Sequence, residues 1–440
     1  MKILFISLGC DKNLVDSEMM IAALSRHGYE MTDNEEEAEV IVVNTCCFIH
    51  DAKEESITTL LEMGRLKETA CCKALIAAGC LAQRYQKEIE TEIPEVDAIV
   101  GTSSFEKIVE VVDDVVGGKK HNEMVELSYL AGQDMDRIVT TGGYYSYLKI
   151  AEGCNKHCSY CIIPKIRGSY RSVPMEKLIS QAESLAKQGV EELMIVAQET
   201  TVYGVDLYGR KMLPELLRKL CGIPGLRWIR VLYCYPEEIT DELIEVMATE
   251  EKICHYIDMP IQHASDRILK RMGRRTTKEE IINIVGKIRK RIPDMAIRTT
   301  LITGFPGETK EDHQELLEFV EEMEFERLGV FTYSKEEDTP AAEMPDQILE
   351  EVKEKRQQEL MECQQQIAFC HAQDMIAKKL KVLIEGELPE EGVYIGRTYQ
   401  DAPNIDGYIF MPATGQYISG EFVDVLVTDA KDYDLIGEIQ

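Results

Sequence analysis

Apolar and polar positions alternate in blocks along the first 116 residues. Short apolar runs of strand length are separated by stretches in which apolar residues recur at helical spacing. The strand candidates are Lys2–Leu8, Val40–Asn44 and Ala74–Ala78, and the helix candidates are Val15–His27 and Ala52–Leu66. Strands and helices that alternate at this pace predict a small α/β domain with a parallel sheet, spanning residues 1–116.

A cysteine follows each of these three strand candidates. Cys10 comes after the first, Cys46 after the second and Cys80 after the third. Ligands of open α/β sheets collect at the carboxyl ends of the strands. We therefore expect the three side chains to converge on one point, although they are far apart in sequence.

The periodicity fades between Gly117 and Gly143, which predicts a linker over residues 117–143. A second α/β region follows over residues 144–370, and the charged helical stretch Pro345–Gln373 leads out of it. Its six strand candidates are Ser146–Ile150, Leu193–Val196, Trp228–Leu232, Tyr256–Met259, Ala296–Leu301 and Glu326–Thr332. Six strand–helix units predict a partial TIM-type barrel, (β/α)6, rather than a closed barrel of eight units.

The last segment, residues 371–440, has the pattern of short strands separated by glycines. The strand candidates are Lys381–Glu385, Val393–Arg397, Tyr408–Met411, Phe422–Thr428 and Leu435–Ile439. Five such strands predict a small β-barrel of the oligonucleotide-binding (OB) type. The segment carries five lysines and arginines against 13 aspartates and glutamates, a net charge of −8. A barrel of that sign should repel phosphate backbones.

The whole chain is also acidic, with 49 lysines and arginines against 79 aspartates and glutamates. A net charge of −30 disfavours nonspecific binding to DNA and favours a basic partner. No apolar run reaches the length of a membrane span, and the N-terminus lacks the pattern of a secretory signal. We therefore expect a soluble cytoplasmic enzyme. In a reducing compartment, 14 cysteines indicate metal binding or redox chemistry.

The most specific motif is CxxxCxxC, formed by Cys154, Cys158 and Cys161 directly after the first strand of the second region. Three thiolates on one loop can hold a cubane iron–sulfur cluster and leave one iron open. An open coordination position is typical of a catalytic metal centre. The alternative is a zinc site with a fourth ligand such as His157, although zinc sites usually combine two CxxC-like pairs.

This motif, with Tyr160 before its last cysteine, resembles that of the radical S-adenosylmethionine enzymes. The resemblance extends to the whole chain. The strings Gly9-Cys10, Asn44-Thr45-Cys46 and Gly79-Cys80-Leu81-Ala82-Gln83 resemble the N-terminal domain of the methylthiotransferases, and the last segment resembles their TRAM domain. Within that family, the strings Leu8–Glu18, Ala52–Ile57 and Pro260–His263 resemble the RimO type, which modifies ribosomal protein uS12.

The resemblance implies two 4Fe-4S clusters and S-adenosylmethionine as cofactors. Cys154, Cys158 and Cys161 would ligate the radical cluster, and Cys10, Cys46 and Cys80 an auxiliary cluster that also keeps one iron open. The family has glycine at the position of Cys47, so Cys47 is an alternative to the favoured Cys46. The residues implied to lie near S-adenosylmethionine are Tyr160 at the adenine, Gln198 and Glu199 at the methionine amino group, and Gly304 and Pro306 in the glycine-rich loop Gly304–Thr309.

The implied activity is transfer of a methylthio group to the β-carbon of an aspartate in uS12, supported by a low-potential electron donor. One alternative is the same chemistry on a tRNA adenosine. The acidic TRAM segment disfavours it, whereas a basic patch on the exposed face of the barrel would favour it. The other alternative is an iron–sulfur protein without catalysis, which serves electron transfer or sulfur carriage.

Overall fold

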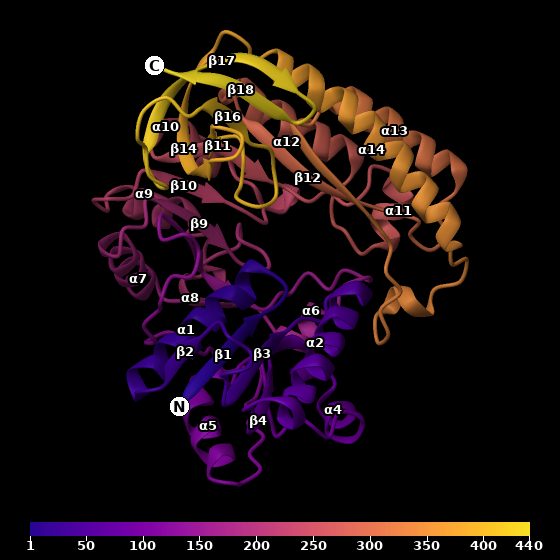
Figure 1. Cartoon of the computed structure of the whole chain (residues 1–440). Coiled ribbons are helices and arrows are strands. Elements are labelled where there is room, and N and C mark those ends of the chain that lie inside the picture. Colours follow the sequence, from indigo (N-terminus) through magenta and orange to yellow (C-terminus); the bar gives the residue numbers. More distant parts are fainter.

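The computed structural model describes all 440 residues and contains three main sheets, together with a small sheet of two strands. The N-terminal sheet and the C-terminal barrel lie at opposite ends of the molecule, and the central sheet lies between them (Figure 1). No helix combines the length and the apolar composition that crossing a lipid bilayer requires.

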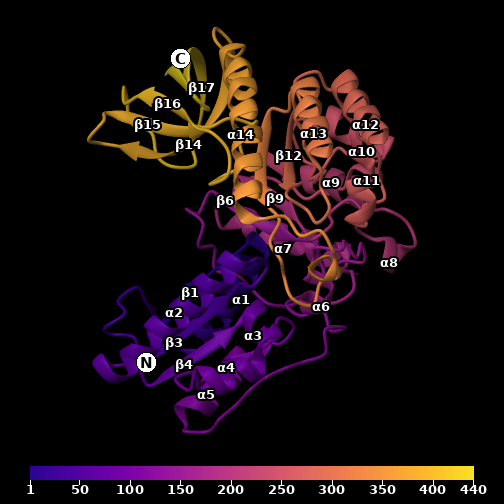
Figure 2. The same ribbon diagram turned by 90° about the vertical axis from the view of Figure 1, so that its right-hand side faces the viewer.

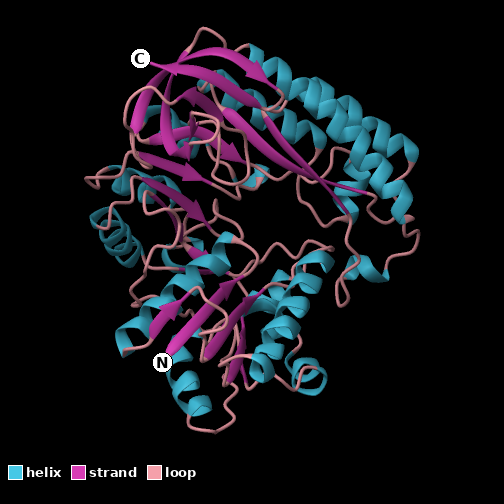
Figure 3. Cartoon of the chain, in the orientation of Figure 1, coloured by secondary structure: helices cyan, strands magenta, loops and turns pink.

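The N-terminal sheet is parallel, in the order β2-β1-β3-β4-β5. Its strands are β1 (Lys2–Ser7), β2 (Glu30–Thr32), β3 (Val40–Thr45), β4 (Ala74–Ala78) and β5 (Ala98–Val100). Its helices are α1 (Asp11–His27), α2 (His50–Thr69), α3 (Gly79–Arg84), α4 (Gln86–Glu92) and α5 (Ile108–Val116). Strands β3 and β4 are buried along their whole length, as expected for parallel strands covered on both faces (Figure 3). The predicted parallel α/β fold is confirmed, with two additional strands of three residues each.

The central sheet has six parallel strands in the order β13-β12-β11-β10-β9-β6. Its strands are β6 (Tyr145–Lys149), β9 (Glu192–Val196), β10 (Trp228–Val231), β11 (Ile253–Asp258), β12 (Ala296–Thr303) and β13 (Arg327–Thr332). The main helices between them are α7 (Met175–Lys187), α9 (Leu213–Cys221), α10 (Asp241–Thr249), α12 (Lys278–Arg291) and α13 (Lys310–Met323). Strands β6 and β13 do not pair, so the sheet is the predicted partial barrel.

Three short helices and the small sheet complete this part of the chain. The helices are α6 (Ile163–Arg167), α8 (Val205–Tyr208) and α11 (Asp266–Arg271), and the small sheet pairs β7 (Ala151–Glu152) with β8 (Arg171–Ser172). The longest helix, α14 (Glu350–Gln373), packs beside α13 and β13 and leads to the C-terminal barrel (Figure 2). It is anchored by Lys353 Nζ, which donates to the Tyr333 carbonyl at 2.8 Å.

The C-terminal barrel is closed, in the strand order β14-β15-β16-β18-β17. The strands are β14 (Lys379–Leu388), β15 (Val393–Arg397), β16 (Ile409–Pro412), β17 (Phe422–Lys431) and β18 (Asp434–Ile439). The five-stranded barrel is therefore confirmed. Acidic side chains after β15 pair with arginines of the central sheet: Asp401 lies 2.5 Å from Arg327, and Asp406 lies 3.4 Å from Arg298.

Residues 117–143 form no helix or regular strand, but they are fastened to the N-terminal part. Glu123 forms a parallel bridge with Val100 at the edge of the N-terminal sheet. Arg137 bonds to the buried Glu18 of α1 and donates to the Ser146 hydroxyl at 2.9 Å. This segment therefore ties the N-terminal part to the first strand of the central sheet.

Candidate functional site

Three loops meet at the carboxyl end of the N-terminal sheet, and each carries one of the predicted cysteines. Cys10 precedes α1, Cys46 follows β3, and Cys80 lies in the first turn of α3 directly after β4. A Cβ atom placed on Gly9 would lie only 2.8 Å from Cys46 Sγ. The sulfur of Cys80 lies 3.8 Å from Oδ1 of Asn13, three residues after Cys10. The fold thus brings Cys10, Cys46 and Cys80 together.

Amide side chains hold these loops in place. The Asn13 side chain donates to the carbonyls of Leu8 and Thr45, both at 2.9 Å, and so joins the ends of β1 and β3. The Asn44 side chain donates back to the Asn13 carbonyl at 2.9 Å. Gly79 has a φ of +87°, which allows the chain to turn from β4 into α3 beside Asn44.

Cys46 and Cys47 occupy different surroundings. Cys47 is fully buried in an apolar cluster, and burial raises the pKa of its thiol to about 12. Burial also raises the pKa of Cys46, and the neighbouring thiol of Cys10 raises it further. The Cys46 sulfur lies against Gly9, directly before Cys10, whereas the Cys47 side chain packs in the apolar cluster and also lies close to Arg84.

The second cysteine group lies on the loop between β7 and α6. Gly153 has a φ of +77°, and a Cβ on it would lie 2.2 Å from the Ser169 carbonyl oxygen, so only glycine fits there. The Cys154 amide donates to the Gly168 carbonyl at 3.1 Å, and the Ser159 amide to the Met272 carbonyl at 2.8 Å. Burial raises the pKa of Cys154 to about 11 and that of Cys161 further.

The donor set of this loop fits an iron–sulfur cluster. Nowhere do three His, Cys, Asp or Glu side chains lie close enough to hold a single metal ion. A cubane cluster is wider than one ion, so its thiolates stand further apart. Cys154 and Cys158 are buried, and the Lys156 amide donates to Cys154 Sγ at 3.4 Å. His157 has a φ of +54° and belongs to no group of three such side chains.

Of the residues expected near S-adenosylmethionine, Tyr160 lies at an open cavity. This cavity of about 680 Å³ is lined by side chains of the N-terminal part, the central sheet and α14, including Phe48, Gln262, Thr300 and Phe331. Tyr160 also packs against the apolar cluster that contains Met272 and Phe305. The cavity therefore reaches from the molecular surface to the CxxxCxxC loop.

Gln198 and Glu199 directly follow β9 and contact residues beside and within that loop, Glu152 and Lys156. The Gln198 side chain donates to Glu152 Oε1 at 2.7 Å, and its own oxygen is buried without a hydrogen-bond partner. Glu199 is 1% exposed, and burial raises its pKa to about 7. Thr201 and Lys156, whose Nζ lies 3.8 Å from Glu199 Oε2, act in the opposite direction. Neither Gln198 Oε1 nor Glu199 Oε2 accepts a hydrogen bond within the protein, and the only cation near Glu199 Oε2 is the Lys156 ammonium.

Gly304 and Pro306 are buried and do not line the cavity. A Cβ on Gly304 would lie 2.3 Å from Cγ of Lys353, so the close approach that glycine permits here is to α14. The Pro306 carbonyl accepts a hydrogen bond from Arg271 Nε at 3.0 Å. The loop Gly304–Thr309 is thus fixed by its contacts with α11 and α14.

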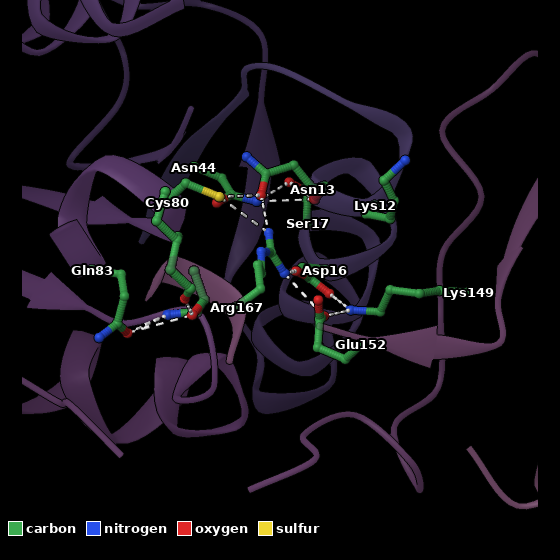
Figure 4. Close-up of polar contacts among 12 residues, drawn as sticks. Lys12, Asn13, Asp16, Ser17, Asn44, Cys80, Gln83, Lys149, Glu152 and Arg167 are labelled. Atoms are coloured by element: carbon green, nitrogen blue, oxygen red, sulfur yellow. Dashed lines mark hydrogen bonds and ion pairs between the residues drawn. The ribbon is translucent and has the colours of Figure 1, made fainter. Parts of the chain in front are cut away.

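Between the two cysteine groups lies a buried polar network that the sequence did not reveal (Figure 4). Arg167, at the end of α6, donates to Cys80 Sγ at 3.5 Å, Asp16 Oδ2 at 2.7 Å and Glu152 Oε2 at 3.1 Å. Lys149 bonds to the same two carboxylates. Burial opposes ionisation of Glu152, but Arg167 and Lys149 hold its pKa well below the usual range. The only sequence signal was a basic residue shortly after the CxxxCxxC motif.

A second contact between the parts lies beside Cys10. Lys12 Nζ lies 3.2 Å from the centre of the Tyr233 ring, and the Tyr233 hydroxyl donates to Asp11 Oδ1 at 3.2 Å. Tyr233 follows β10, so the turn after Cys10 rests against the carboxyl end of the central sheet. The two cysteine groups therefore lie on facing edges of two parallel sheets.

Comparisons with known proteins agree with this architecture. The family described as "Uncharacterized protein family UPF0004" matches residues 2–101, the Radical SAM superfamily residues 148–320, and the TRAM domain residues 376–439. Among solved structures, the radical S-adenosylmethionine methyltransferase TsrM from Kitasatospora setae has a TM-score of 0.54. It is 15% identical, with 75% of this chain and 72% of that chain covered, which shows the fold alone. Fold and motif define an enzyme of the radical S-adenosylmethionine class.

Close relatives narrow this class. The ribosomal protein uS12 methylthiotransferase RimO of Lachnoclostridium phytofermentans is 65% identical over 437 residues, with 99% of both chains covered. The protein of the same name from Clostridioides difficile is 50% identical over 439 residues, with 100% of this chain and 99% of the relative covered. The chain belongs to the RimO family of methylthiotransferases.

Proposed function

We propose that this protein is a radical S-adenosylmethionine methylthiotransferase that modifies the β-carbon of an aspartate in ribosomal protein uS12. The observation that carries the proposal is the placement of two groups of three cysteines on facing sheet edges, in a chain that matches RimO proteins over its full length. A non-catalytic iron–sulfur protein would not need a large cavity that reaches the CxxxCxxC loop.

We assign Cys154, Cys158 and Cys161 to the radical 4Fe-4S cluster, and Cys10, Cys46 and Cys80 to the auxiliary 4Fe-4S cluster. When bound, the clusters and S-adenosylmethionine supply the radical that removes a hydrogen atom from an unactivated carbon, and the sulfur that replaces it. The protein itself orients these groups and excludes water from them. The proposed boundaries are residues 1–116 for the N-terminal domain, 117–143 for the linker, 144–370 for the radical S-adenosylmethionine domain and 371–440 for the TRAM domain.

The proposed cofactor pocket combines residues of the CxxxCxxC loop with residues that contact it. Tyr160 provides an aromatic surface for the adenine at the cavity wall. The free oxygens of Gln198 and Glu199 accept hydrogen bonds from the methionine amino group, as their buried and unpartnered state favours. Gly304 and Pro306 do not line the cavity, and we propose that their loop, bonded to α11 and packed on α14, supports the pocket indirectly.

The proposed macromolecular partner is a basic protein. A chain of net charge −30 attracts a basic ribosomal protein and repels a phosphate backbone. A low-potential electron donor is also required, because S-adenosylmethionine is cleaved by one-electron reduction. These partners follow from charge and chemistry together with the names of the relatives.

The deciding experiment is anaerobic. The clusters are rebuilt, S-adenosylmethionine, a reductant and sulfide are added, and recombinant uS12 and an unmodified tRNA are offered separately. Mass spectrometry then searches each for a methylthio group, with the Cys158→Ala variant as the inactive control. A methylthio group on a uS12 aspartate supports the proposal. Modification of the tRNA alone would overturn the substrate, and failure to form deoxyadenosine would overturn the radical chemistry.

The choice between Cys46 and Cys47 has its own test. We expect Cys46→Ala to lower the iron bound by the auxiliary site to near zero and Cys47→Ala to leave it unchanged, since the Cys46 sulfur lies against the turn that carries Cys10, whereas Cys47 packs in the apolar cluster. Iron and sulfide are measured in a chain that lacks the three CxxxCxxC cysteines. Retention of iron in Cys46→Ala with loss in Cys47→Ala would reverse the assignment.

A further inference from the structure

The guanidinium of Arg167 joins the two proposed cluster sites. It belongs to α6 of the central part, six residues after Cys161, yet its Nη2 lies 3.5 Å from the sulfur of Cys80 in the N-terminal part. Its Nη1 contacts Glu152, two residues before Cys154. Arg167 is 2% exposed, so water does not weaken these contacts.

Among the three cysteines of the auxiliary site, only Cys80 receives a hydrogen bond from a side chain at its sulfur. The other nearby cations are directed elsewhere. Lys12 pairs with Asp11 at 2.9 Å, and Arg84 pairs with Glu336 at 3.0 Å. The central part of the molecule therefore contributes a donor to a ligand set that otherwise comes from the N-terminal sheet.

The charges around Arg167 are balanced before any cluster is present. Arg167 and Lys149 supply two positive charges, and Asp16 and Glu152 supply two negative charges, all within one buried network. A cluster held by three thiolates adds negative charge next to Arg167. One-electron reduction adds one more negative charge at the same place, so a fixed cation and hydrogen bond stabilise the reduced form more than the oxidised form.

We propose that Arg167 is a positioning residue of the auxiliary cluster, and that its hydrogen bond to Cys80 raises the reduction potential of that cluster. The inference rests on the proposed function, because it assumes that Cys10, Cys46 and Cys80 hold a cluster. Hydrogen bonds to cluster sulfurs and charges near them are established determinants of such potentials.

The experiment uses the full chain with Cys154, Cys158 and Cys161 replaced by alanine, so that only the auxiliary site can bind iron. The cluster is rebuilt anaerobically and titrated with dithionite, which delivers one electron per cluster, while the reduced form is followed by electron paramagnetic resonance. Arg167→Gln and Arg167→Lys are compared with Arg137→Gln. Arg137 is the matched control, because it is also buried between the two parts and pairs with Glu18, but touches no cysteine.

We expect Arg167→Gln to shift the midpoint to a more negative potential, Arg167→Lys to shift it less, and Arg137→Gln to leave it unchanged. An unchanged midpoint in Arg167→Gln at equal iron content would overturn the inference. If Arg167→Gln loses iron but unfolds at the same denaturant midpoint as Arg137→Gln, the loss supports the positioning role of Arg167. If Arg167→Gln unfolds at a lower midpoint, its role is purely structural and the inference is overturned.

The same experiment gives a different result if the proposed function itself is wrong. If the parent chain with its three alanines binds no iron, the auxiliary cluster itself is wrong, and the inference about Arg167 falls with it. If the parent binds a cluster and the potential ignores Arg167, only the inference is wrong.

Discussion

At the scale of single residues, glycines at the ends of strands set the shape of the candidate site. Gly79 turns β4 into the helix that carries Cys80, and a Cβ there would lie 2.2 Å from Asn44 Oδ1 and 2.7 Å from the Thr45 carbonyl. Gly118 has a similar positive φ but nothing within 4 Å of its missing Cβ. Alanine substitutions at the two positions therefore separate the cost of a left-handed backbone from the cost of a steric clash.

We expect Gly118→Ala to cost about 1–2 kcal/mol, the usual strain of a left-handed residue with a side chain. Gly79→Ala should cost more and should also lower the iron bound at the auxiliary site, because Cys80 moves with α3. Denaturant midpoints and iron content check this. Equal effects of the two substitutions on iron binding would show that the contact at Gly79 does not shape the site.

Glu199 gives the protein a pH dependence at its core. Its pKa, raised by burial to about 7, lies above that of a carboxyl in an unfolded chain, so between these values the folded protein holds a proton that the unfolded chain has released. The free energy of unfolding therefore falls as the pH rises through this window and levels off above about 7. Between pH 6 and pH 8 we expect a loss of roughly 1 kcal/mol.

Glu199→Gln should remove this component, because the amide does not titrate. Denaturation of the metal-free protein can be followed through Trp228, the only tryptophan, which lies in β10 of the central sheet. The difference in midpoint between pH 6 and pH 8 should shrink in the variant. A difference as large as in the parent would assign the pH dependence to another group.

The placement of the six candidate cysteines could be predicted from the sequence because their signals are local. Each auxiliary cysteine directly follows a strand, and the other three lie within eight positions. Arg167 could not be predicted, because its partner Cys80 is 87 positions away and only the docking of two sheets brings them together. Gly304 shows the converse: its glycine signal was real, but the group that approaches it is the side chain of Lys353.

At the scale of elements, α14 depends on a buried ion pair. Arg356 lies 2.8 Å from Glu308, a carboxylate that is 2% exposed and belongs to the loop after β12. Burial opposes the ionisation of Glu308, while His263 and Arg356 lower its pKa. The pair thus connects α14 to the loop that carries Gly304 and Pro306.

We expect Arg356→Met to destabilise the protein by about 3–5 kcal/mol, because it leaves a buried carboxylate without its nearest cation. Adding Glu308→Gln should recover part of the loss. The surface pair Lys355–Glu359 is the control, and Lys355→Met should cost less than about 1 kcal/mol. Hydrogen exchange in α14 and in the loop Gly304–Thr309 is the measurement. Unchanged exchange in Arg356→Met would exclude this role for the pair.

Element prediction worked where patterns were long. All six strands of the central sheet and all five of the C-terminal barrel were anticipated within a few residues. Strands β2 and β5 were missed because each has only three residues, too few to display a period. The 117–143 segment lacked a pattern for another reason: its contacts are backbone bridges and single ion pairs, which leave no hydrophobic periodicity.

At the scale of the whole molecule, one carboxylate joins the C-terminal barrel to the central sheet. Glu192 of β9 is fully buried and lies 2.9 Å from Arg230 of β10 and 2.6 Å from Arg397 of β15. Trp228 packs edge-on against Phe422 of the barrel at 4.7 Å between ring centres, so its fluorescence reports on this interface.

We expect Glu192→Gln to weaken docking of the barrel by about 3–5 kcal/mol, because two buried arginines lose their shared counter-charge. Trp228 fluorescence should then change at a lower denaturant concentration than in the parent. Glu215→Gln, which removes an exposed pair with Arg210, is the control and should have little effect. A Glu192→Gln midpoint equal to that control would mean that the barrel is held by other contacts.

The same interface changes how the acidity of the barrel is understood. Asp401 and Asp406 belong to the net charge of −8, but both point inward to arginines of the central sheet. Part of this acidity therefore serves assembly of the molecule rather than attraction of a basic partner. Sequence charge counts cannot separate these uses, because pairing depends on the docked geometry.

The contact between Arg167 and Cys80 also has a consequence for the order in which the protein matures. Translation releases the N-terminal sheet first, and all three of its cysteines have been made long before Arg167. That sheet can fold on the ribosome, but its ligand set receives the guanidinium only after the CxxxCxxC loop and α6 have followed and docked. The surroundings of Cys80 are therefore complete only after the later cysteine loop has been made, which couples maturation of the earlier cysteine group to synthesis of the later one.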